Sequence, residues 1–121
     1  MKKFMNSFLF AARGIAVAFT DQLNLKVQAA CIAVVVSSGF YFDLSDIEWC
    51  CLLLAAGLVI TLEMVNTSIE KLVDLVTSEF HPLAARVKDI AAGAVLFGAI
   101  VSVIVGWLVF RPHAIAWWQS W

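Results

Sequence analysis

From the start of this chain of 121 residues, apolar positions recur with the period of an α-helix and polar positions lie between them. The first apolar positions recur every three or four residues, at Phe4, Phe8, Ala11, Ile15 and Phe19. This spacing places them on one face and predicts an amphipathic helix over about residues 3–20. Basic side chains beside an aromatic stripe suit a helix lying in a membrane interface, and they equally suit a helix packed against the protein's own transmembrane segments.

Three long apolar segments follow, at about residues 24–42, 47–76 and 90–110. The third carries no charge and is long enough to cross a hydrocarbon core of about 30 Å. The apolar run of the first, from Val27 to Phe42, covers only about 24 Å, so we expect its helix to extend back to Leu23. The second continues without a breaker into a polar stretch, which predicts one long helix with a cytoplasmic extension.

Short polar connections separate these segments. The turn Asp43–Asp46 offers Ser45 or Asp46 as an N-cap, and its brevity predicts that the second span runs antiparallel to the first. Pro82 disfavours helical geometry at the residue before it, which predicts a break over residues 78–82. The tail that follows the third span is rich in tryptophan and is expected to anchor the chain at an interface.

Composition places these segments in a membrane. Hydrophobic residues make up 63% of the chain and charged residues 14%, against roughly 25% charged in soluble domains. No interleaving of basic and aromatic residues indicates a nucleic-acid surface, so we expect no nucleic-acid partner. The N-terminal apolar run is too short for a secretory signal, so we expect it to belong to the mature protein. The expected fold is one all-α membrane domain over residues 1–121, with three transmembrane helices and an N-terminal amphipathic surface helix.

The basic residues give the expected orientation. Seven of the eight fall on one side of the predicted membrane: Lys2, Lys3, Arg13, Lys26, Lys71, Arg86 and Lys88. Arg111 falls on the other side, together with the acidic turn between the first two spans. The positive-inside rule therefore predicts a cytoplasmic N-terminus and polar extension, with the C-terminus outside.

Most of the groups able to do chemistry lie in one stretch, Leu62–Asp89. Its first polar positions fall at i, i+3, i+4, i+7 and i+11, and they are Glu63, Asn66, Thr67, Glu70 and Asp74. At about 100° per residue they share one helix face, with the three carboxylates nearly aligned. Packing alone does not explain a carboxylate stripe that runs out of an apolar segment, and we interpret it as an active site.

Position along the stripe predicts different roles. Glu63 lies nearest the membrane boundary, where ionisable groups are usually functional, and it suits a general base acting on a hydroxyl. Glu70 and Asp74 lie farther into the cytoplasm and are better placed to hold Mg²⁺, which prefers oxygen ligands. Lys88 could neutralise phosphate charge during transfer, with Asp89 holding either Lys88 or a metal.

These assignments have structural alternatives. Glu70 and Asp74 could belong to a solvated helix face stabilised by neighbouring charges. For His81 we favour a turn or helix-capping role over catalysis. Lys88 and Asp89 could equally anchor the third span at the interface. The sequence contains no Walker A motif, kinase glycine-rich loop or His-Glu-x-x-His motif.

A dense series of motifs fills this stretch: Glu63-Met-Val-Asn66-Thr-Ser-Ile-Glu70, then Asp74, then Ser78-Glu79-Phe80-His81-Pro82, then Lys88-Asp89 before an Ala/Gly run. Together with the three-span layout, it resembles the small bacterial diacylglycerol kinase/undecaprenol kinase family. The resemblance implies a homotrimer in the bacterial cytoplasmic (inner) membrane, with active sites at subunit boundaries. It also implies transfer of the γ-phosphate of ATP to a membrane lipid hydroxyl, with Mg²⁺ as cofactor.

The resemblance further implies roles for individual residues. Glu63 is similar to the catalytic base, with Asn66 beside it, and Glu70 to a Mg²⁺ ligand, with Asp74 lining the site. ATP contacts are implied for Glu70, Glu79, Phe80, His81, Lys88, Asp89 and, in the N-terminal helix, Phe10. Lipid contacts are implied for Glu63, Phe19 and Ala92.

One position departs from the family pattern. The family usually carries a second metal-binding glutamate before the first span, in a stretch like Glu-x-Asn. This chain has Gln22-Leu23-Asn24 there, with Asp21 immediately before it. A neutral amide is a weaker magnesium ligand, so either Asp21 takes over or the metal site is altered.

Two hypotheses from different classes follow. The first is a lipid kinase, whose Asp74-Leu-Val-Thr, His81-Pro82 and Ala91-Ala-Gly-Ala-Val segments look closer to the undecaprenol branch than to the diacylglycerol branch. The alternative is a catalytically impaired protein of the same fold that binds nucleotide or lipid without turnover, which Gln22 keeps open. A cation-coupled transporter is disfavoured because the charges cluster at one interface instead of spanning the bilayer.

Overall fold

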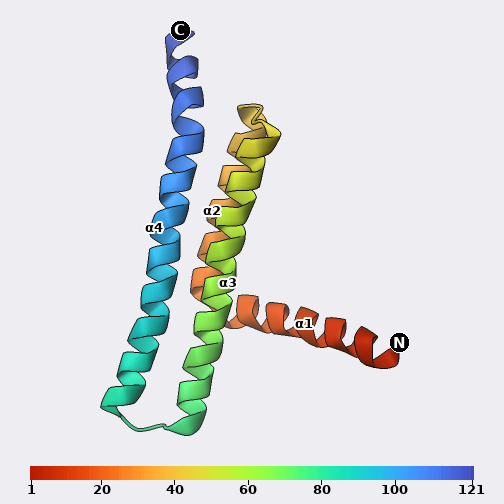
Figure 1. Cartoon of the computed structure of the whole chain (residues 1–121), viewed down its shortest axis with the longest axis vertical. Helices are drawn as coiled ribbons and strands as arrows, with labels where there is room; N and C mark the ends of the chain where they lie inside the picture. The colour runs from red at the N-terminus through yellow and green to blue at the C-terminus, as the bar shows by residue number, and fades with distance from the viewer.

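The computed structural model describes residues 1–121 and contains helices only. They are α1 (Lys2–Asp21), α2 (Leu23–Tyr41), α3 (Asp46–Val76) and α4 (Pro82–Gln119). Figure 1 shows α2, α3 and α4 running alongside one another, while α1 leaves the bundle sideways. Three of the four helices, α2 to α4, are long and apolar enough to cross a membrane. The expected all-α membrane fold is confirmed.

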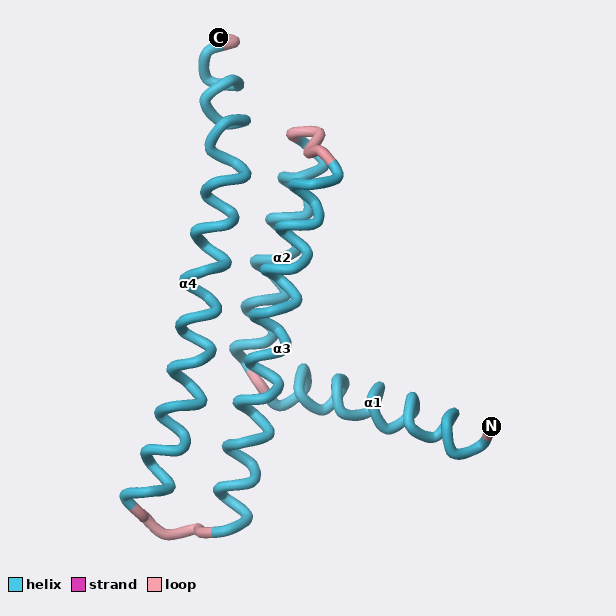
Figure 2. The backbone as a smooth tube through the Cα atoms, in the orientation of Figure 1, coloured by secondary structure: helices cyan, strands magenta, loops and turns pink.

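A single residue, Gln22, separates α1 from α2. Its backbone is extended, with φ −108° and ψ 117°, so the helix stops there and the chain changes direction. The N-terminus consequently lies far from the bundle (Figure 2). The aromatic side chains of α1, including Phe4, Phe8 and Phe10, are exposed. Such a helix needs a lipid surface or another protein against its apolar face.

Specific contacts hold the turn between α2 and α3. The backbone nitrogen of Ser45 donates to Glu48 Oε2 at 2.8 Å, and Glu48 N donates to Ser45 Oγ at 3.5 Å, which completes a capping box. Asp43 is left-handed (φ 53°), a conformation that aspartate tolerates better than most residues. Gly39 admits the ring of Trp49, because a Cβ there would lie 2.6 Å from the ring. Together these contacts fold α3 back along α2.

Close packing joins α3 to α4. Gly98 of α4 faces Leu62 of α3, and a Cβ at position 98 would collide with that leucine side chain. Ser102 Oγ donates to the backbone oxygen of Ala55 at 3.1 Å, a hydrogen bond between the two helices. Small residues and interhelical hydrogen bonds are the means by which helices associate in lipid, where the hydrophobic effect is absent.

The three bundle helices differ in length. The 19 residues of α2 span about 28 Å, close to the roughly 30 Å of a hydrocarbon core. The 31 residues of α3 span about 46 Å and the 38 residues of α4 about 57 Å. Both α3 and α4 are therefore longer than a bilayer core requires, and the loop between them lies beyond the end of α2 from which α1 leaves (Figure 1).

The C-terminal tail is helical, a feature that its interpretation as a simple interfacial anchor did not include. α4 continues through Pro112 as far as Gln119. His113 Nε2 lies 2.8 Å from Glu48 Oε1, and the imidazole ring lies 6.0 Å from the ring of Phe42. These contacts with α3 and the α2–α3 turn hold the extension in place, although proline removes one helical hydrogen bond.

Little of the chain is buried within itself. Only 12 of the 121 residues are buried, and large apolar side chains are exposed along every helix. Exposed apolar area on this scale would cause a soluble monomer to aggregate, whereas lipid chains cover it in a bilayer. The exposure therefore agrees with a multi-pass membrane protein.

Candidate functional site

The polar stripe of α3 is buried where it meets α2. Glu63 is 2% exposed, and Asn66 and Thr67 are also buried. The side-chain nitrogen of Gln28, from α2, donates to Glu63 Oε2 at 3.4 Å. Thr67 Oγ1 donates to the backbone oxygen of Glu63 at 2.9 Å. The predicted base is thus a buried carboxylate with one side-chain hydrogen-bond donor.

A second amide–carboxylate pair lies one turn farther along α3. Asn66 Nδ2 donates to Glu70 Oε1 at 3.0 Å. Asn66 Oδ1 and Gln28 Oε1 are buried without a hydrogen-bond partner. A buried acceptor without a partner costs about 1–3 kcal/mol, which a bound water, ligand or cation can recover. Two such oxygens lie beside Glu63 and Glu70, where a water, a ligand or a cation could bind to them.

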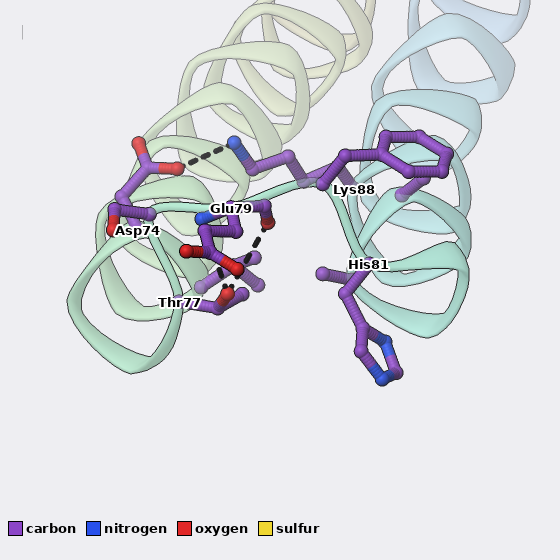
Figure 3. A pocket seen from close by; sticks show the side chains of 10 residues that line it. Asp74, Thr77, Glu79, His81 and Lys88 are labelled. Carbon is purple, nitrogen blue, oxygen red and sulfur yellow. Dashed lines mark hydrogen bonds and ion pairs between the residues drawn. The ribbon is translucent and has the colours of Figure 1, made fainter.

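A cavity lies at the other end of the stripe, between the end of α3, the α3–α4 loop and the start of α4. Its volume is about 480 Å³, within the roughly 300–1,000 Å³ of small-molecule sites. The lining residues that were predicted to bind nucleotide or metal are Asp74, Glu79, Phe80, His81 and Lys88. Figure 3 shows Asp74 of α3 and Lys88 of α4 pointing toward each other, with Thr77 and Glu79 beside them and the imidazole of His81 pointing away.

An ion pair crosses this cavity. Lys88 Nζ lies 2.6 Å from Asp74 Oδ1 (Figure 3), and both side chains remain partly exposed. In the structure Lys88 therefore pairs with Asp74 and not with Asp89. Neighbouring residues of α4 point about 100° apart, whereas Asp74 faces Lys88 across the loop. Asp89 is exposed, does not line the cavity and makes no ion pair.

The loop residues take local structural roles. Glu79 N donates to Thr77 Oγ1 at 3.3 Å, and Thr77 Oγ1 donates back to Glu79 O at 3.2 Å. His81 caps α4, with its Nδ1 accepting from the backbone nitrogen of Leu83 at 3.2 Å. Its imidazole is turned away from Asp74 (Figure 3). The capping interpretation of His81 thus has direct geometric support, and its ring is free at the other nitrogen.

The two alternatives for the missing metal ligand differ in their surroundings. Asp21 Oδ2 lies 2.8 Å from Lys71 Nζ, an ion pair that ties the end of α1 to α3. Gln22 makes no side-chain hydrogen bond and is only partly buried. No three His, Cys, Asp or Glu side chains come together anywhere in the chain.

The structure separates some of the residues that the resemblance grouped together. Phe10 lies on the projecting part of α1, is exposed and does not line the cavity. Phe19 is half-buried near the end of α1, and Ala92 is exposed on α4. Asp74 follows Glu63 by 11 residues, about 16 Å of helix rise. One chain therefore presents two centres, one around Glu63 and one around Lys88.

Gln28 and Lys71 received no functional role from the sequence, yet both contact site residues. A signal was available for Gln28, because it is an isolated polar residue in an apolar span. Such residues usually face the interior of a helix bundle. No comparable signal marked Lys71, because its sequence neighbours suggest only a solvated helix face. Its contact with Asp21 of α1 becomes evident only in the structure.

The arrangement suits phosphoryl transfer. A buried carboxylate can accept a proton from a hydroxyl that reaches it from the membrane, and a lysine beside an open cavity can hold phosphate oxygens. The oxygen donors also fit Mg²⁺, because Glu70 and the unpartnered Asn66 Oδ1 lie on adjacent turns. Magnesium commonly takes one or two protein carboxylates and completes its shell with phosphates and water.

Comparison with known proteins identifies the family. The family model for prokaryotic diacylglycerol kinase matches residues 9–110. The chain is 43% identical to undecaprenol kinase of Bacillus subtilis over 93% of its length and 91% of that protein. It is 38% identical to diacylglycerol kinase of Synechocystis over 88% of its length and 61% of that protein. It is 28% identical to diacylglycerol kinase of Escherichia coli K12 over 86% of its length and 85% of that protein. The chain therefore belongs to the prokaryotic diacylglycerol kinase family.

Proposed function

We propose that this protein phosphorylates undecaprenol with ATP at the cytoplasmic face of the bacterial inner membrane. Membership of the family makes it a lipid kinase. The lipid assignment rests on one observation: identity to an undecaprenol kinase reaches 43% over almost the whole chain, against 38% and 28% for the diacylglycerol kinases of Synechocystis and Escherichia coli. Diacylglycerol is the competing acceptor, since both lipids present a hydroxyl at the membrane surface.

In the proposed reaction Glu63 is the general base. The O–H bond of the lipid breaks and its proton passes to the carboxylate of Glu63. The lipid oxygen forms a bond to the γ-phosphorus of ATP as the bond to the β-phosphate oxygen breaks and ADP leaves. Burial of Glu63 at the inner end of the polar stripe supports this role, since the base must reach a hydroxyl that stays near the lipid.

Glu70 and Asn66 would hold Mg²⁺, with Asp74 as a further candidate. When bound, the ion would neutralise charge on the transferring phosphate. Asn66 keeps Glu70 oriented through its 3.0 Å hydrogen bond and offers Oδ1 as a neutral oxygen ligand. The second metal-binding position, Gln22 or Asp21, is supplied in our proposal by the end of α1, from the same chain or from a neighbouring one.

The cavity around Lys88 is the proposed nucleotide site. Lys88 can exchange its ion pair with Asp74 for phosphate oxygens, because both groups are partly exposed and the pair is weak. Glu79, Phe80 and His81 line the same cavity. Asp89 and Phe10 lie outside it in one chain, so we propose that their ATP contacts arise in an assembled oligomer, with Phe10 from another subunit.

The position of α1 supports the membrane placement. Its ion pair with Lys71 sets the C-terminal end of α1 beside the polar half of α3. A surface helix at that level would put Glu63 at the inner edge of the lipid and the α3–α4 loop in the cytoplasm. We further propose a homotrimer, in which other copies cover the exposed helix faces and bring α1 residues such as Phe19 to the lipid near Ala92.

The test is transfer of radiolabelled phosphate from ATP with purified protein in mixed micelles that contain either undecaprenol or diacylglycerol. We expect labelling of both lipids, with the higher kcat/KM for undecaprenol. Equal or higher values for diacylglycerol would overturn the lipid assignment. If neither lipid is labelled while the protein still binds ATP, the catalytically impaired alternative is favoured.

A matched pair of variants tests the base. Glu63→Gln should lower kcat by about a hundredfold to ten-thousandfold, since general-base catalysis contributes about 10²–10⁴. Asp46→Asn makes the same chemical change at the opposite, exposed end of α3 and should leave kcat unchanged. Full activity of Glu63→Gln would remove the base assignment and leave the family membership untouched.

A further inference from the structure

We propose that Gln28 is a positioning residue that orients the carboxylate of Glu63 for proton transfer. This inference rests on the proposed role of Glu63 as the base. Gln28 lies within α2, while the proposed metal and phosphate residues lie at the end of α1, on α3, in the α3–α4 loop and on α4. Gln28 would therefore add a residue of α2 to a reaction centre that otherwise consists of the polar stripe of α3 and the nucleotide cavity.

Gln28 is the one side chain that donates a hydrogen bond to the Glu63 carboxylate, at 3.4 Å from Nε2 to Oε2. Glu63 is almost completely buried, so water offers little competition for that oxygen. Leu25 lies one turn before Gln28 and is fully buried. Residues three apart lie on the same side of a helix, so this side of α2 is the one turned into the chain.

The orientation of the amide follows from charge. Turning the amide over would place Oε1 against a carboxylate oxygen, which is repulsive, so the nitrogen faces Glu63. The cost of this choice is visible in the structure, because Gln28 Oε1 is left buried without a partner. Asn66 repeats the arrangement, since its nitrogen donates to Glu70 and its Oδ1 has no partner. Each amide therefore faces a carboxylate at the expense of its own oxygen.

Fixing one carboxylate oxygen has a chemical consequence. With Oε2 held by Gln28, the other oxygen, Oε1, is the one that can accept the lipid proton. Gln28 gains no bond and loses none in the transfer, and it touches neither the phosphate nor the attacking oxygen in this scheme. It acts through Glu63, because a carboxylate that rotates freely spends less time aimed at the hydroxyl.

The test uses variants that differ in their donor and not in their bulk. Gln28→Met keeps nearly the same volume and loses the N–H, so kcat should fall about tenfold to a hundredfold. Gln28→His restores a ring N–H donor and should recover most of this loss. The KM for ATP, the binding of a fluorescent ATP analogue and thermal unfolding in detergent should change little in either variant. Ser38→Ala on the same helix is the control, because that hydroxyl bonds only to its own helix backbone.

A double variant separates positioning from a purely structural role. In the Glu63→Gln background, Gln28→Met should cause no further decrease in the single-turnover rate, because its partner carboxylate is already gone. Full activity of Gln28→Met, or an equal additional loss in the Glu63→Gln background, would overturn the proposal while leaving lipid phosphorylation by the unmodified protein intact. Absence of any lipid phosphorylation by the unmodified protein would instead overturn the proposed function and this inference with it.

Discussion

The ammonium group of Lys88 lies 2.6 Å from the carboxylate of Asp74, so that an ion pair joins the end of α3 to the first turns of α4. These residues are separated by a loop with its own internal hydrogen bonds and by the His81 cap. Both side chains line the cavity between α3, the loop and α4. The ion pair occupies the position where we expect the phosphate oxygens of the nucleotide. In our proposal a nucleotide competes with Asp74 for the lysine.

Lys88→Met should therefore lower kcat/KM for ATP by tenfold or more, because a charge-assisted contact with phosphate is worth about 1.5–3 kcal/mol. Thermal stability should hardly change, since exposed ion pairs contribute about 0–1 kcal/mol. Arg86→Met is the matched control, because Arg86 is an exposed cation on the same helix outside the cavity. Steady-state kinetics at varied ATP decide the matter, and equal effects of the two variants would contradict a phosphate role for Lys88.

The ion pair between Asp21 and Lys71 makes a prediction about magnesium. Asp21 is paired with Lys71, and no group of three acidic side chains forms around it, so Asp21→Asn should leave the Mg²⁺ concentration for half-maximal activity within about twofold of its original value. Gln22→Glu adds a carboxylate at the family position and should lower that concentration severalfold. The measurement is activity against Mg²⁺ concentration at saturating ATP. A large increase in the requirement for Asp21→Asn would identify Asp21 as the substitute ligand instead.

The contact between Gly98 and Leu62 makes a prediction about packing. Gly98→Leu forces extra side-chain volume between α3 and α4 and should destabilise the protein by about 1–3 kcal/mol. Gly106→Leu is the matched control on the same helix, because nothing lies within 4 Å of a Cβ at that position. Thermal unfolding in detergent gives the comparison. A similar loss in both variants would show that another surface, and not the α3–α4 contact, limits residue size along α4.

The capping box at the start of α3 makes a prediction that separates stability from activity. Ser45→Ala removes the hydroxyl that caps Glu48 N and should cost about 1 kcal/mol. The box lies at the end of α3 opposite to the polar stripe that we propose to be catalytic, so kcat should remain unchanged at temperatures where the protein is folded. Ser45→Thr preserves the hydroxyl and should retain most of the stability. A fall in kcat without a fall in unfolding temperature would contradict this separation.

Much of the fold could be predicted from sequence because each helix carries its own signal. Ser45 is a favoured N-cap residue and indicates where α3 begins after the α2–α3 turn. Pro82 indicates the start of α4, with His81 as its cap. The continuation of α4 past Pro112 could not be predicted, because it depends on His113 reaching Glu48 from a helix far away in sequence. Proline disfavours the helix locally, and tertiary contacts oppose that preference.

The candidate site also contains some features that the sequence predicts and others that it does not. The shared face of Glu63, Asn66 and Glu70 follows from the period of the α-helix, and these residues indeed lie together. The pairing of Lys88 with Asp74 and the contact of Gln28 with Glu63 join different helices. Such contacts depend on how the helices rotate and slide against each other, which no local pattern encodes.

The turn between α2 and α3 has a consequence for chemistry at the far end of the bundle. Gln28 lies 14 residues before Phe42, and Glu63 lies 18 residues after Ser45, so each is more than about 20 Å of helix from the turn. The left-handed Asp43 and the close fit of Trp49 on Gly39 set the rotational phase of one helix relative to the other. One residue inserted between Gln28 and the turn would rotate the amide by about 100° and aim it away from Glu63. The alignment of Glu63, the proposed base, is thus fixed by a turn at the other end of the two helices.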